Sequence, residues 1–527
     1  MNRIDQIHLA TMVLITLGAV IASCSHFKTK HKQPNILFIM SDDHAQKAIS
    51  AYGHDLLETP NIDRLAEEGA IFRQSFVTNS ICAPSRAVLL TGKYSHLNGM
   101  VYNSSPFNWD QPSFTKLLQD AGYQTALVGK IHLDGTPQGF DYSMVLPGQG
   151  VYYNPVFLEN GEQKQFEGHC TPLTTQFALD WLENIRDKSK PFALLYHHKA
   201  PHRSWLPEIK YLDFLEDREF DYPENFFDDY EGRGSPARQQ EMEIVNHLLW
   251  APDLKFEVHP QYGGPRKFSS ATNLMTNEQR EAWLAVYNPL NEAFIQKKPT
   301  GQELARFKFN RYLRDYLKTV KSIDDGVGEV LDYLEKNGLL ENTIVVYTSD
   351  QGFYLGEHGW FDKRFMYEES LSTPLLVRYP KEIKPGTVVN EMVLNLDLAP
   401  TFLDYAGLEK PGDMQGESFR KLVAGKKMNW RDAIYYHFYE YPSVHMVKRH
   451  YGIRTDRYKL IHFYYDVDEW EMYDLKTDLN EMKSVYGDPA YSDIQAKLHK
   501  KLEELRIKYG DSDELNRKYL EKYLESR

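Results

Sequence analysis

Cysteine is scarce in this chain, with only Cys24, Cys82 and Cys170 among 527 residues. Three cysteines are too few for a disulfide framework, so packing rather than cross-linking has to hold the fold together. Cys82 lies inside the most informative motif of the sequence. We therefore do not expect it to form a disulfide bridge.

Basic residues are also in short supply, because 61 Lys and Arg face 74 Asp and Glu, for a formal charge of −13. No broad positive field is available to hold nucleic acid, and we expect no nucleic-acid partner. An anionic substrate would have to be bound by a few local cations.

Near the start of the chain, an apolar run extends from Leu9 to Ile21, after Arg3 and before small residues and Cys24. This arrangement is typical of an export signal, and the run is too short to span a bilayer comfortably as a permanent helix. Ile21-Ala22-Ser23-Cys24 resembles the cleavage box of bacterial lipoproteins. We predict a lipoprotein-type signal over residues 1–24 and export to the periplasm or outer surface of a bacterium, with membrane attachment only through a lipid on Cys24. An uncleaved anchor is the alternative.

Short, continuous apolar segments alternate with helical patterns over most of the chain. The apolar segments suit strands buried on both faces, and they lie at Asn35 to Met40, Thr125 to Gly129, Phe192 to Tyr196, Thr343 to Thr348 and Pro374 to Tyr379. The helical patterns lie at Asn61 to Glu68, Ser113 to Ala121, Thr174 to Ile185 and about Leu304 to Asn337. The alternation predicts an α/β fold with a large mixed, mostly parallel sheet flanked by helices.

From about Ile434 the sequence changes to closely spaced aromatic and β-branched segments, which predict a smaller C-terminal antiparallel sheet. A charged helical tail follows from about Ser492 to Leu524. We therefore expect an N-terminal domain over residues 33–425 and a C-terminal subdomain over 430–527. Residues from about 205 to 300 have weak periodicity and are interpreted as an insertion into the first domain.

The motif around Cys82 is Cys82-Ala83-Pro84-Ser85-Arg86, followed by apolar residues and Thr91-Gly92. Pro84 can start a helix, which would place Cys82 at the positive end of the helix, where an anion is favoured. A lone cysteine before a helix is more often simply a buried apolar residue. Here, however, the pattern resembles the signature of type I sulfatases, in the alkaline-phosphatase-like superfamily. The resemblance extends from about Asn35 to Glu481, and it implies that a separate maturation enzyme oxidises Cys82 to formylglycine.

Two polar pairs follow predicted strands, Asp42-Asp43 and Asp350-Gln351. The carboxyl ends of parallel strands meet at one edge of a sheet, where such folds bind ligands. Either pair alone would usually be an ordinary surface loop. Their hard oxygen donors suit Ca²⁺ better than zinc. Both pairs match the metal-ligand positions of the family, so the resemblance implies one Ca²⁺ bound by both pairs and by residue 82.

Three further segments match catalytic positions of the family. Gly129-Lys130-Ile131-His132 resembles its Gly-Lys-x-His segment, Ala200-Pro201-His202 supplies a second histidine, and the residues after Gln351 supply Lys363. The resemblance implies that Lys130, Lys363 and the metal stabilise a sulfate group while the hydrated formylglycine attacks it.

The resemblance also assigns the proton transfers. His202 would protonate the leaving alcohol, and His132 would take the proton from the second hydroxyl of the formylglycine hydrate, so that sulfate leaves and the aldehyde returns. Arg86 would hold the nucleophile and offset the charge of the carboxylates.

The sugar is indicated by two segments, Asp362 to Arg378 and Tyr451 to Leu475, which are similar to exported bacterial N-acetylglucosamine-6-sulfatases. We therefore expect a sulfated oligosaccharide or glycosaminoglycan fragment, with 6-O-sulfated N-acetylglucosamine or glucosamine of heparan-type or mucin glycans as the best candidate. Candidate sugar contacts are His358, His445 and Arg449, although a solvated basic turn explains the last two equally well. The aromatic residues of the insertion, Trp205, Tyr211 and Tyr262, could stack on a sugar, but most such residues only pack.

Several alternatives stay open at this point. The enzyme could act on another glycosaminoglycan position, such as a 2-O-sulfated uronic acid, or on choline, steroid or aryl sulfates. A phosphate or phosphonate monoester hydrolase is a second possibility, against which Lys130, His132 and Lys363 favour sulfate. A glycan-binding lipoprotein without activity is disfavoured, because every matching position is present.

Overall fold

The computed structural model describes residues 33–256 and 272–527. The predicted signal segment with Cys24, and Tyr262 of the predicted insertion, lie outside these ranges. Within the described part of the chain, no helix combines the length and the apolar character needed to cross a membrane.

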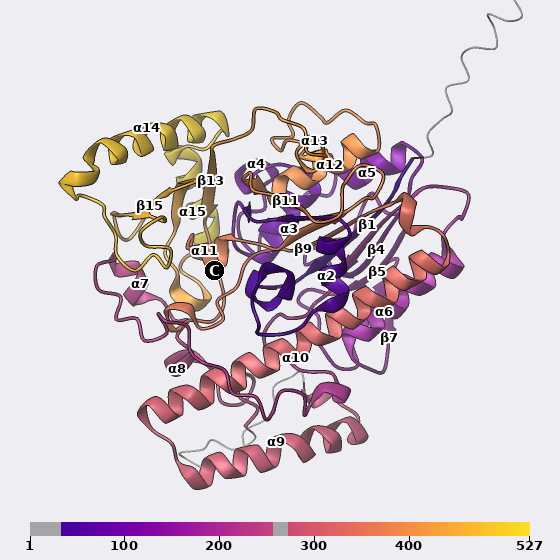
Figure 1. Ribbon diagram of the computed structural model, residues 1–527, viewed down its shortest axis with the longest axis horizontal. Coiled ribbons are helices and arrows are strands. Elements are labelled where there is room, and N and C mark those ends of the chain that lie inside the picture. Colours follow the sequence, from indigo (N-terminus) through magenta and orange to yellow (C-terminus); the bar gives the residue numbers. More distant parts are fainter. Residues whose placement is uncertain (1–32, 257–271) are drawn as a thin grey trace, which may run out of the picture. The chain divides into compact units, whose positions relative to one another are not determined.

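The main sheet is built from strands collected along most of the chain. Their bounds are β1 (Asn35–Ser41), β2 (Ala70–Phe72), β4 (Gln124–Lys130), β5 (Tyr142–Leu146), β6 (Val156–Glu159), β7 (Glu162–Gln165), β8 (Phe192–His197), β9 (Thr343–Ser349), β10 (Leu375–Arg378) and β11 (Thr387–Val389). Among the described residues these ten strands form one sheet in the order β11-β2-β10-β9-β1-β8-β4-β5-β6-β7 (Figure 1). β3 (Ser75–Phe76) and β12 (Val393–Leu394) form a separate short pair.

The sheet is mixed but mostly parallel, as the sequence predicts. Among the described strands of this sheet, only β10 and β6 are antiparallel to both of their neighbours. The five predicted strands correspond to β1, β4, β8, β9 and β10, which confirms the expected fold class. The remaining strands of the sheet, β2, β5, β6, β7 and β11, were not predicted. They have five residues or fewer and lie outside the five predicted strands in the sheet order, toward its two edges.

Helices cover both faces of the sheet. One face carries α2 (Pro60–Glu67), α6 (Cys170–Asp180) and α10 (Gly301–Lys336), and the other carries α3 (Cys82–Thr91), α5 (Phe114–Asp120) and α12 (Leu398–Tyr405). Alternate side chains of β1 therefore pack into two separate cores, Ile36 and Phe38 into one and Leu37 and Ile39 into the other. Burial on both faces explains why this strand is apolar from Ile36 to Met40.

The predicted insertion consists largely of irregular chain with short helices, α7 (Ser235–Gln239) and α8 (Ile244–His247), followed by α9 (Asn277–Lys297). α9 was not predicted. Its start is fixed by a capping box in which Thr276 and Gln279 bond each other's backbone amides. Other short helices are α4 (Ser95–Asn98), α11 (Glu368–Leu371) and α13 (Arg420–Val423).

The smaller antiparallel sheet is present near the C-terminus, as predicted. Its strands are β13 (Ala433–Phe438), β14 (His450–Thr455), β15 (Tyr458–Phe463) and β16 (Glu469–Asp474), paired in that order. The helical tail is divided into α14 (Ser492–Lys508) and α15 (Asp513–Glu525). β13 lies against the chain just before α3, where the amide of His437 donates to the carbonyl of Thr78 at 3.0 Å.

Gly129 lies where the backbones of β4 and β8 approach each other closely. It has a φ of 103°, and a Cβ there would lie 1.8 Å from the carbonyl oxygen of His197 on β8. We expect Gly129→Ala to lower the free energy of unfolding by about 3 kcal/mol, because backbone strain and a backbone clash add. Urea unfolding measures this.

Gly53 provides the control for this substitution. Its φ is 91°, and no atom lies within 4 Å of the position a Cβ would take. Gly53→Ala should therefore cost only about 1 kcal/mol. Equal losses in the two variants would contradict the steric explanation.

Candidate active site

Three buried carboxylates meet at the carboxyl edge of the main sheet. Asp42 and Asp43 follow β1 and Asp350 follows β9, and their oxygen atoms lie within 4.8 Å of one another. β1 and β9 pair in parallel as far as Ser41 and Ser349, so the two loops leave the sheet side by side.

Three cations, each from a different element, surround the carboxylates. Nε of Arg86, on α3, lies 2.8 Å from Oδ2 of Asp350. Lys130, the last residue of β4, forms an ion pair with Asp42. Nζ of Lys363 lies 2.5 and 2.7 Å from the two oxygens of Asp43. Buried carboxylates need such partners, because removing a charge from water is costly.

The cations do not compensate the three carboxylates equally. Burial acts to raise the pKa of each. Among the surrounding cations, Lys130 and then Arg86 nevertheless hold the pKa of Asp42 well below its usual range. The pKa of Asp43, by contrast, is raised to about 6 by burial, and that of Asp350 to about 7 by burial and by the charge of Asp42. A further positive charge would therefore be accommodated here.

Gln351 completes a set of oxygen donors. Its Nε2 donates to Oδ1 of Asp43, whereas its Oε1 is buried and has no hydrogen-bond partner among the residues described. Carboxylate and amide oxygens are the ligands preferred by hard divalent cations. The orphaned amide oxygen and the three carboxylates fit such an ion.

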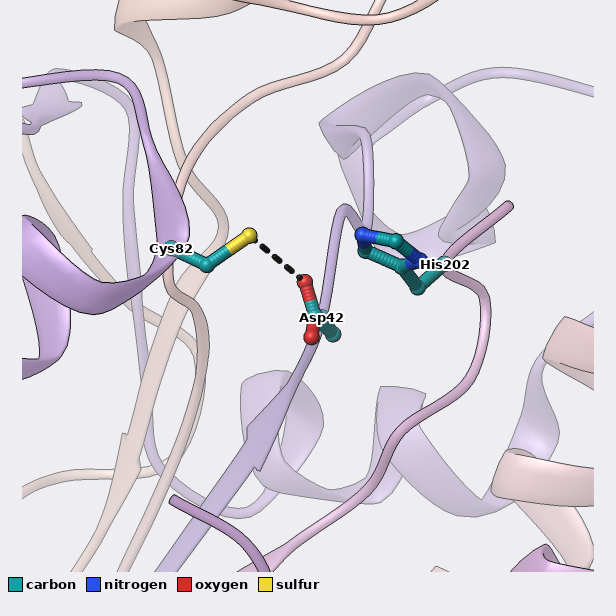
Figure 2. A group of neighbouring side chains, drawn as sticks. All are labelled: Asp42, Cys82 and His202. Carbon is teal, nitrogen blue, oxygen red and sulfur yellow. Dashed lines mark hydrogen bonds between the residues drawn. The ribbon is translucent and has the colours of Figure 1, made fainter. Parts of the chain in front are cut away.

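Cys82 points into this cluster from the first turn of α3 (Figure 2). Its Sγ lies 3.4 Å from Oδ1 of Asp42, 3.5 Å from Nζ of Lys363 and 3.6 Å from Nε2 of Gln351. Burial, and then the charge of Asp42, raises the pKa of the thiol. The unmodified thiol is thus protonated and a poor nucleophile. The other described cysteine, Cys170, is also free and buried.

Two histidines border the cluster. Nδ1 of His202, after β8, bonds the carbonyl of Arg203 at 2.7 Å, and its Nε2 lies 3.9 Å from Oδ2 of Asp43. Figure 2 shows its ring beside Asp42. His132 follows β4, and its Nδ1 is buried without a partner among the described side chains. Burial, and then the charge of Lys130, lowers the pKa of His132 to about 2 and that of His202 well below its usual value, so both rings are neutral.

A polar wall next to Lys363 connects this cluster to the smaller sheet. Asp362 accepts from Nε of Arg364 at 2.9 Å and lies 3.4 Å from Nε2 of His445. Arg364 in turn lies 3.4 Å from Oε1 of Glu440. His445, a predicted sugar contact, thus reaches a residue adjacent to Lys363.

The other two predicted sugar contacts are not part of this wall. His358 is fully buried, and its Nδ1 lies 2.8 Å from Oδ2 of Asp228. Arg449 is also fully buried and donates to the carbonyl of Tyr439 at 2.8 Å. Neither contacts the carboxylate cluster, so we do not retain them as sugar contacts.

The aromatic residues of the predicted insertion also pack rather than line the site, where they are described. Trp205 is fully buried against Tyr312, and the hydroxyl of Tyr211 bonds Asp325. The interpretation as packing residues therefore accounts for both.

Sequence reasoning missed several residues at the site. Asp362 and Arg364 flank Lys363 directly, and that charged run was the available signal. Gln149, whose Oε1 lies 2.5 Å from Nζ of Lys130, lies between two glycines in the loop after β5. Glu440 carries no local signal, because its role depends on contacts with distant segments.

The chain is similar in sequence to known proteins. The sulfatase family model matches residues 34–408, and the model of the N-sulphoglucosamine sulphohydrolase C-terminal region matches residues 356–508. An N-acetylglucosamine-6-O-sulfatase of Bacteroides thetaiotaomicron is 48% identical over 96% of this chain and 92% of its own length.

Solved structures are similar as well. BT4656 in complex with its substrate D-glucosamine-2-N,6-O-disulfate has a TM-score of 0.89 at 48% identity, covering 92% of this chain and 99% of that one. A phosphonate monoester hydrolase from Silicibacter pomeroyi has a TM-score of 0.66 at 22% identity, over 90% of this chain and 96% of its own. That second likeness shows the shared fold alone.

Asn103 is expected to hold the first turn of α3. Its Oδ1 accepts from the amide of Ala83 at 3.1 Å, and no side chain at the N-cap residue Ile81 does so. Loss of a cap of this kind costs about 1 kcal/mol. Asn103→Ala should therefore lower the free energy of unfolding by that amount and speed amide hydrogen exchange at Ala83.

Asn108→Ala is the matched control, since Asn108 bonds the amide of Asp110 on the exposed part of the same segment. It should leave exchange in α3 unchanged. Faster exchange in both variants would indicate a general loosening of the segment instead of a lost cap.

Proposed function

The chain belongs to the sulfatase family of sulfuric ester hydrolases, and we propose that it removes the 6-O-sulfate from N-acetylglucosamine or N-sulfated glucosamine in glycosaminoglycan fragments. The observation that carries the chemistry is the position of Cys82, whose Sγ lies within 3.6 Å of Asp42, Lys363 and Gln351. The sugar rests on the relative named as an N-acetylglucosamine-6-O-sulfatase, 48% identical over nearly the whole chain.

Two groups belong to the proposal. We propose that Asp42, Asp43, Asp350, Gln351 and residue 82 hold one Ca²⁺, which when bound lowers the pKa of a hydroxyl at residue 82 and stabilises charge on the sulfate. We also propose that a maturation enzyme converts Cys82 to formylglycine, whose hydrate supplies two hydroxyls, one to attack sulfur and one to lose a proton later. The protonated, buried thiol of the unmodified residue supports the need for this conversion.

Lys130 and Lys363 would hold the sulfate group. Nζ of Lys363 lies 3.5 Å from Sγ of Cys82 and pairs with Asp43, whereas Lys130 pairs with Asp42, which Cys82 contacts, so the two can donate to different oxygens of a sulfate attached at residue 82. Arg86 remains on Asp42 and Asp350 and offsets their charge. Donors fixed in this way stabilise the transition state without having to reorganise.

His202 would protonate the leaving sugar oxygen from Nε2. Its Nδ1 is held by the carbonyl of Arg203, which leaves Nε2 directed toward the cluster. A sulfate anion beside the ring favours its protonated form, although the ring is neutral in the free protein. His132, with a neutral ring and an unpaired Nδ1, would then accept the proton from the remaining hydroxyl at residue 82.

The location of the enzyme is also a proposal. The predicted signal over residues 1–24 supports export, with a lipid on Cys24 as the means of attachment to a membrane. A glycosaminoglycan substrate is compatible with such a location, because these polymers lie outside the bacterial cytoplasm.

Sulfate release from singly sulfated sugars tests the reaction and the sugar. Protein whose formylglycine content has been checked by peptide mass should release sulfate from 6-O-sulfated N-acetylglucosamine faster than from sugars sulfated at other positions. Cys82→Ala should reduce the rate by about 10⁴-fold or more, because it removes the nucleophile. Turnover of phosphate esters by converted protein that leaves every sulfate ester intact would refute the proposal.

Removal of Ca²⁺ tests the metal site. Ca²⁺ at 100 times its dissociation constant should raise the free energy of unfolding by about 2.7 kcal/mol, and chelation should abolish sulfate release. Asp350→Asn should weaken Ca²⁺ binding, as measured by calorimetry. Asp332→Asn is the control, because Asp332 is a surface residue with a side chain 71% exposed. Full activity of chelated protein would argue against a metal role.

A further inference from the structure

Lys199 is a buried cation that the proposed reaction does not use. It is only 4% exposed, and its ammonium group forms no hydrogen bond or ion pair with any described residue. Its one polar contact is with the face of Tyr152, whose ring centroid lies 4.9 Å from Nζ. An ammonium group that is removed from water and left unpaired is costly, so such residues normally have an anionic partner in the functional state.

Lys199 lies at the site and not in a remote core. It starts the turn that carries His202, since the amide of His202 donates to the carbonyl of Lys199 at 3.1 Å. The same turn is fixed to the cluster, because the amide of Asp42 donates to the carbonyl of Ala200 at 3.1 Å. Tyr152, beneath the ammonium group, donates its hydroxyl to the carbonyl of His202 at 2.6 Å.

An exposed loop connects Lys199 to the cluster. Gln149 is exposed to solvent, yet its side chain reaches Nζ of Lys130 inside the cluster. Gln149 and Tyr152 belong to the same loop after β5, so the exposed loop that contacts Lys130 also carries the ring next to Lys199.

Lys199 does not contact the cluster in which the sulfate would react. It makes no ion pair with Asp42 or Asp43, which Lys130 and Lys363 already occupy. It shares its turn with His202, the residue proposed to protonate the departing sugar oxygen. Lys199 therefore lies on the turn that carries the proposed acid for the leaving sugar.

Electrostatics support an anion at this position. Burial, and then the charge of Lys130, lowers the pKa of Lys199 to about 8. An anion next to Nζ would favour the charged form and relieve this cost. The transferred sulfate would already be met by Lys130, Lys363 and the metal, so a second negative group would give Lys199 its own partner.

We propose that Lys199 binds a second anionic group on the leaving sugar, with the N-sulfate of a 2-N,6-O-disulfated glucosamine as its ligand. This inference rests on the proposed function and adds a specificity residue to it. The relative BT4656 has D-glucosamine-2-N,6-O-disulfate as its bound substrate, which carries both groups. The neutral acetyl group of N-acetylglucosamine-6-O-sulfate offers Lys199 no charge.

The test compares two substrates that share the reacting 6-O-sulfate and differ in the substituent on the sugar nitrogen. For Lys199→Met, kcat/KM on glucosamine-2-N,6-O-disulfate should fall about 10-fold or more, mainly through KM, because one hydrogen bond to a charged group is lost. On N-acetylglucosamine-6-O-sulfate, kcat/KM should stay within about 3-fold of wild type. Lys199→Arg should restore most of the difference.

Lys308→Met is the matched control. Lys308 is also 4% exposed, lies 4.6 Å from the ring centroid of Trp250 and has a pKa lowered to about 8, first of all by burial. It lies on α10, and its Nζ donates to the carbonyl of Val245. If removing a buried lysine lowers activity only by disturbing the fold, Lys308→Met should lower kcat/KM equally on the two substrates.

A direct binding measurement covers the case in which Lys199→Met is poorly folded. Calorimetry with both sugars on Cys82→Ala and on Cys82→Ala with Lys199→Arg should show tighter binding of the disulfated sugar in each. Equal losses on the two substrates in Lys199→Met, or no loss on either, would overturn the role of Lys199. Failure of wild type to act on both sugars would instead overturn the proposed function, and this subsite with it.

Discussion

Burial of three carboxylates at one edge of a parallel sheet is the constraint on which the rest of the site depends. Asp42, Asp43 and Asp350 can share this position only because cations arrive from separate parts of the chain. Arg86 comes from α3, Lys130 from the end of β4 and Lys363 from the loop after β9. A buried carboxylate that loses its partner becomes an uncompensated charge. The fold therefore cannot assemble the sheet edge without also assembling most of the reactive groups.

The smaller sheet matters because it holds both the segment before Cys82 and the segment after Lys363. The hydroxyl of Tyr436, on β13, accepts from the amide of Ser80, just before Cys82, and donates to the carbonyl of Arg364, just after Lys363. Glu440 extends the same connection, since it accepts from the amide of Asn103 at 2.7 Å and contacts Arg364. Asn103 in turn holds the first turn of α3. The smaller sheet thus sets the distance between the residue-82 side chain and Lys363, and a catalytic site is sensitive to such distances.

The sequence predicted those parts of the molecule whose cause is local. β1 and β9 are recognisable because burial on both faces makes their central residues a continuous apolar run, and Cys82 is recognisable from its motif. The antiparallel direction of β10 was not predictable, because an apolar run has the same sequence pattern in a parallel and in an antiparallel strand. His358 was misjudged because closeness in sequence to Lys363 does not specify where a ring points, and its ring is held by Asp228. Glu440 depends on Asn103 and Arg364, which no local pattern could connect to it.

The residues that would react and those that would face the sugar have different physical surroundings. Lys130 and Lys363 are buried and pair with the buried carboxylates Asp42 and Asp43, so a change in any one of these residues leaves a charge uncompensated. Gln149 lies on an exposed loop, and Lys199 has no partner to lose. Gln149 also bonds Lys130, whereas under its proposed role a change at Lys199 would alter which sugar is bound at little cost to the carboxylate cluster. Loops on a rigid scaffold commonly carry such variable contacts. Such a separation would allow one fixed sulfate site to serve sugars that differ only in a substituent away from the sulfate.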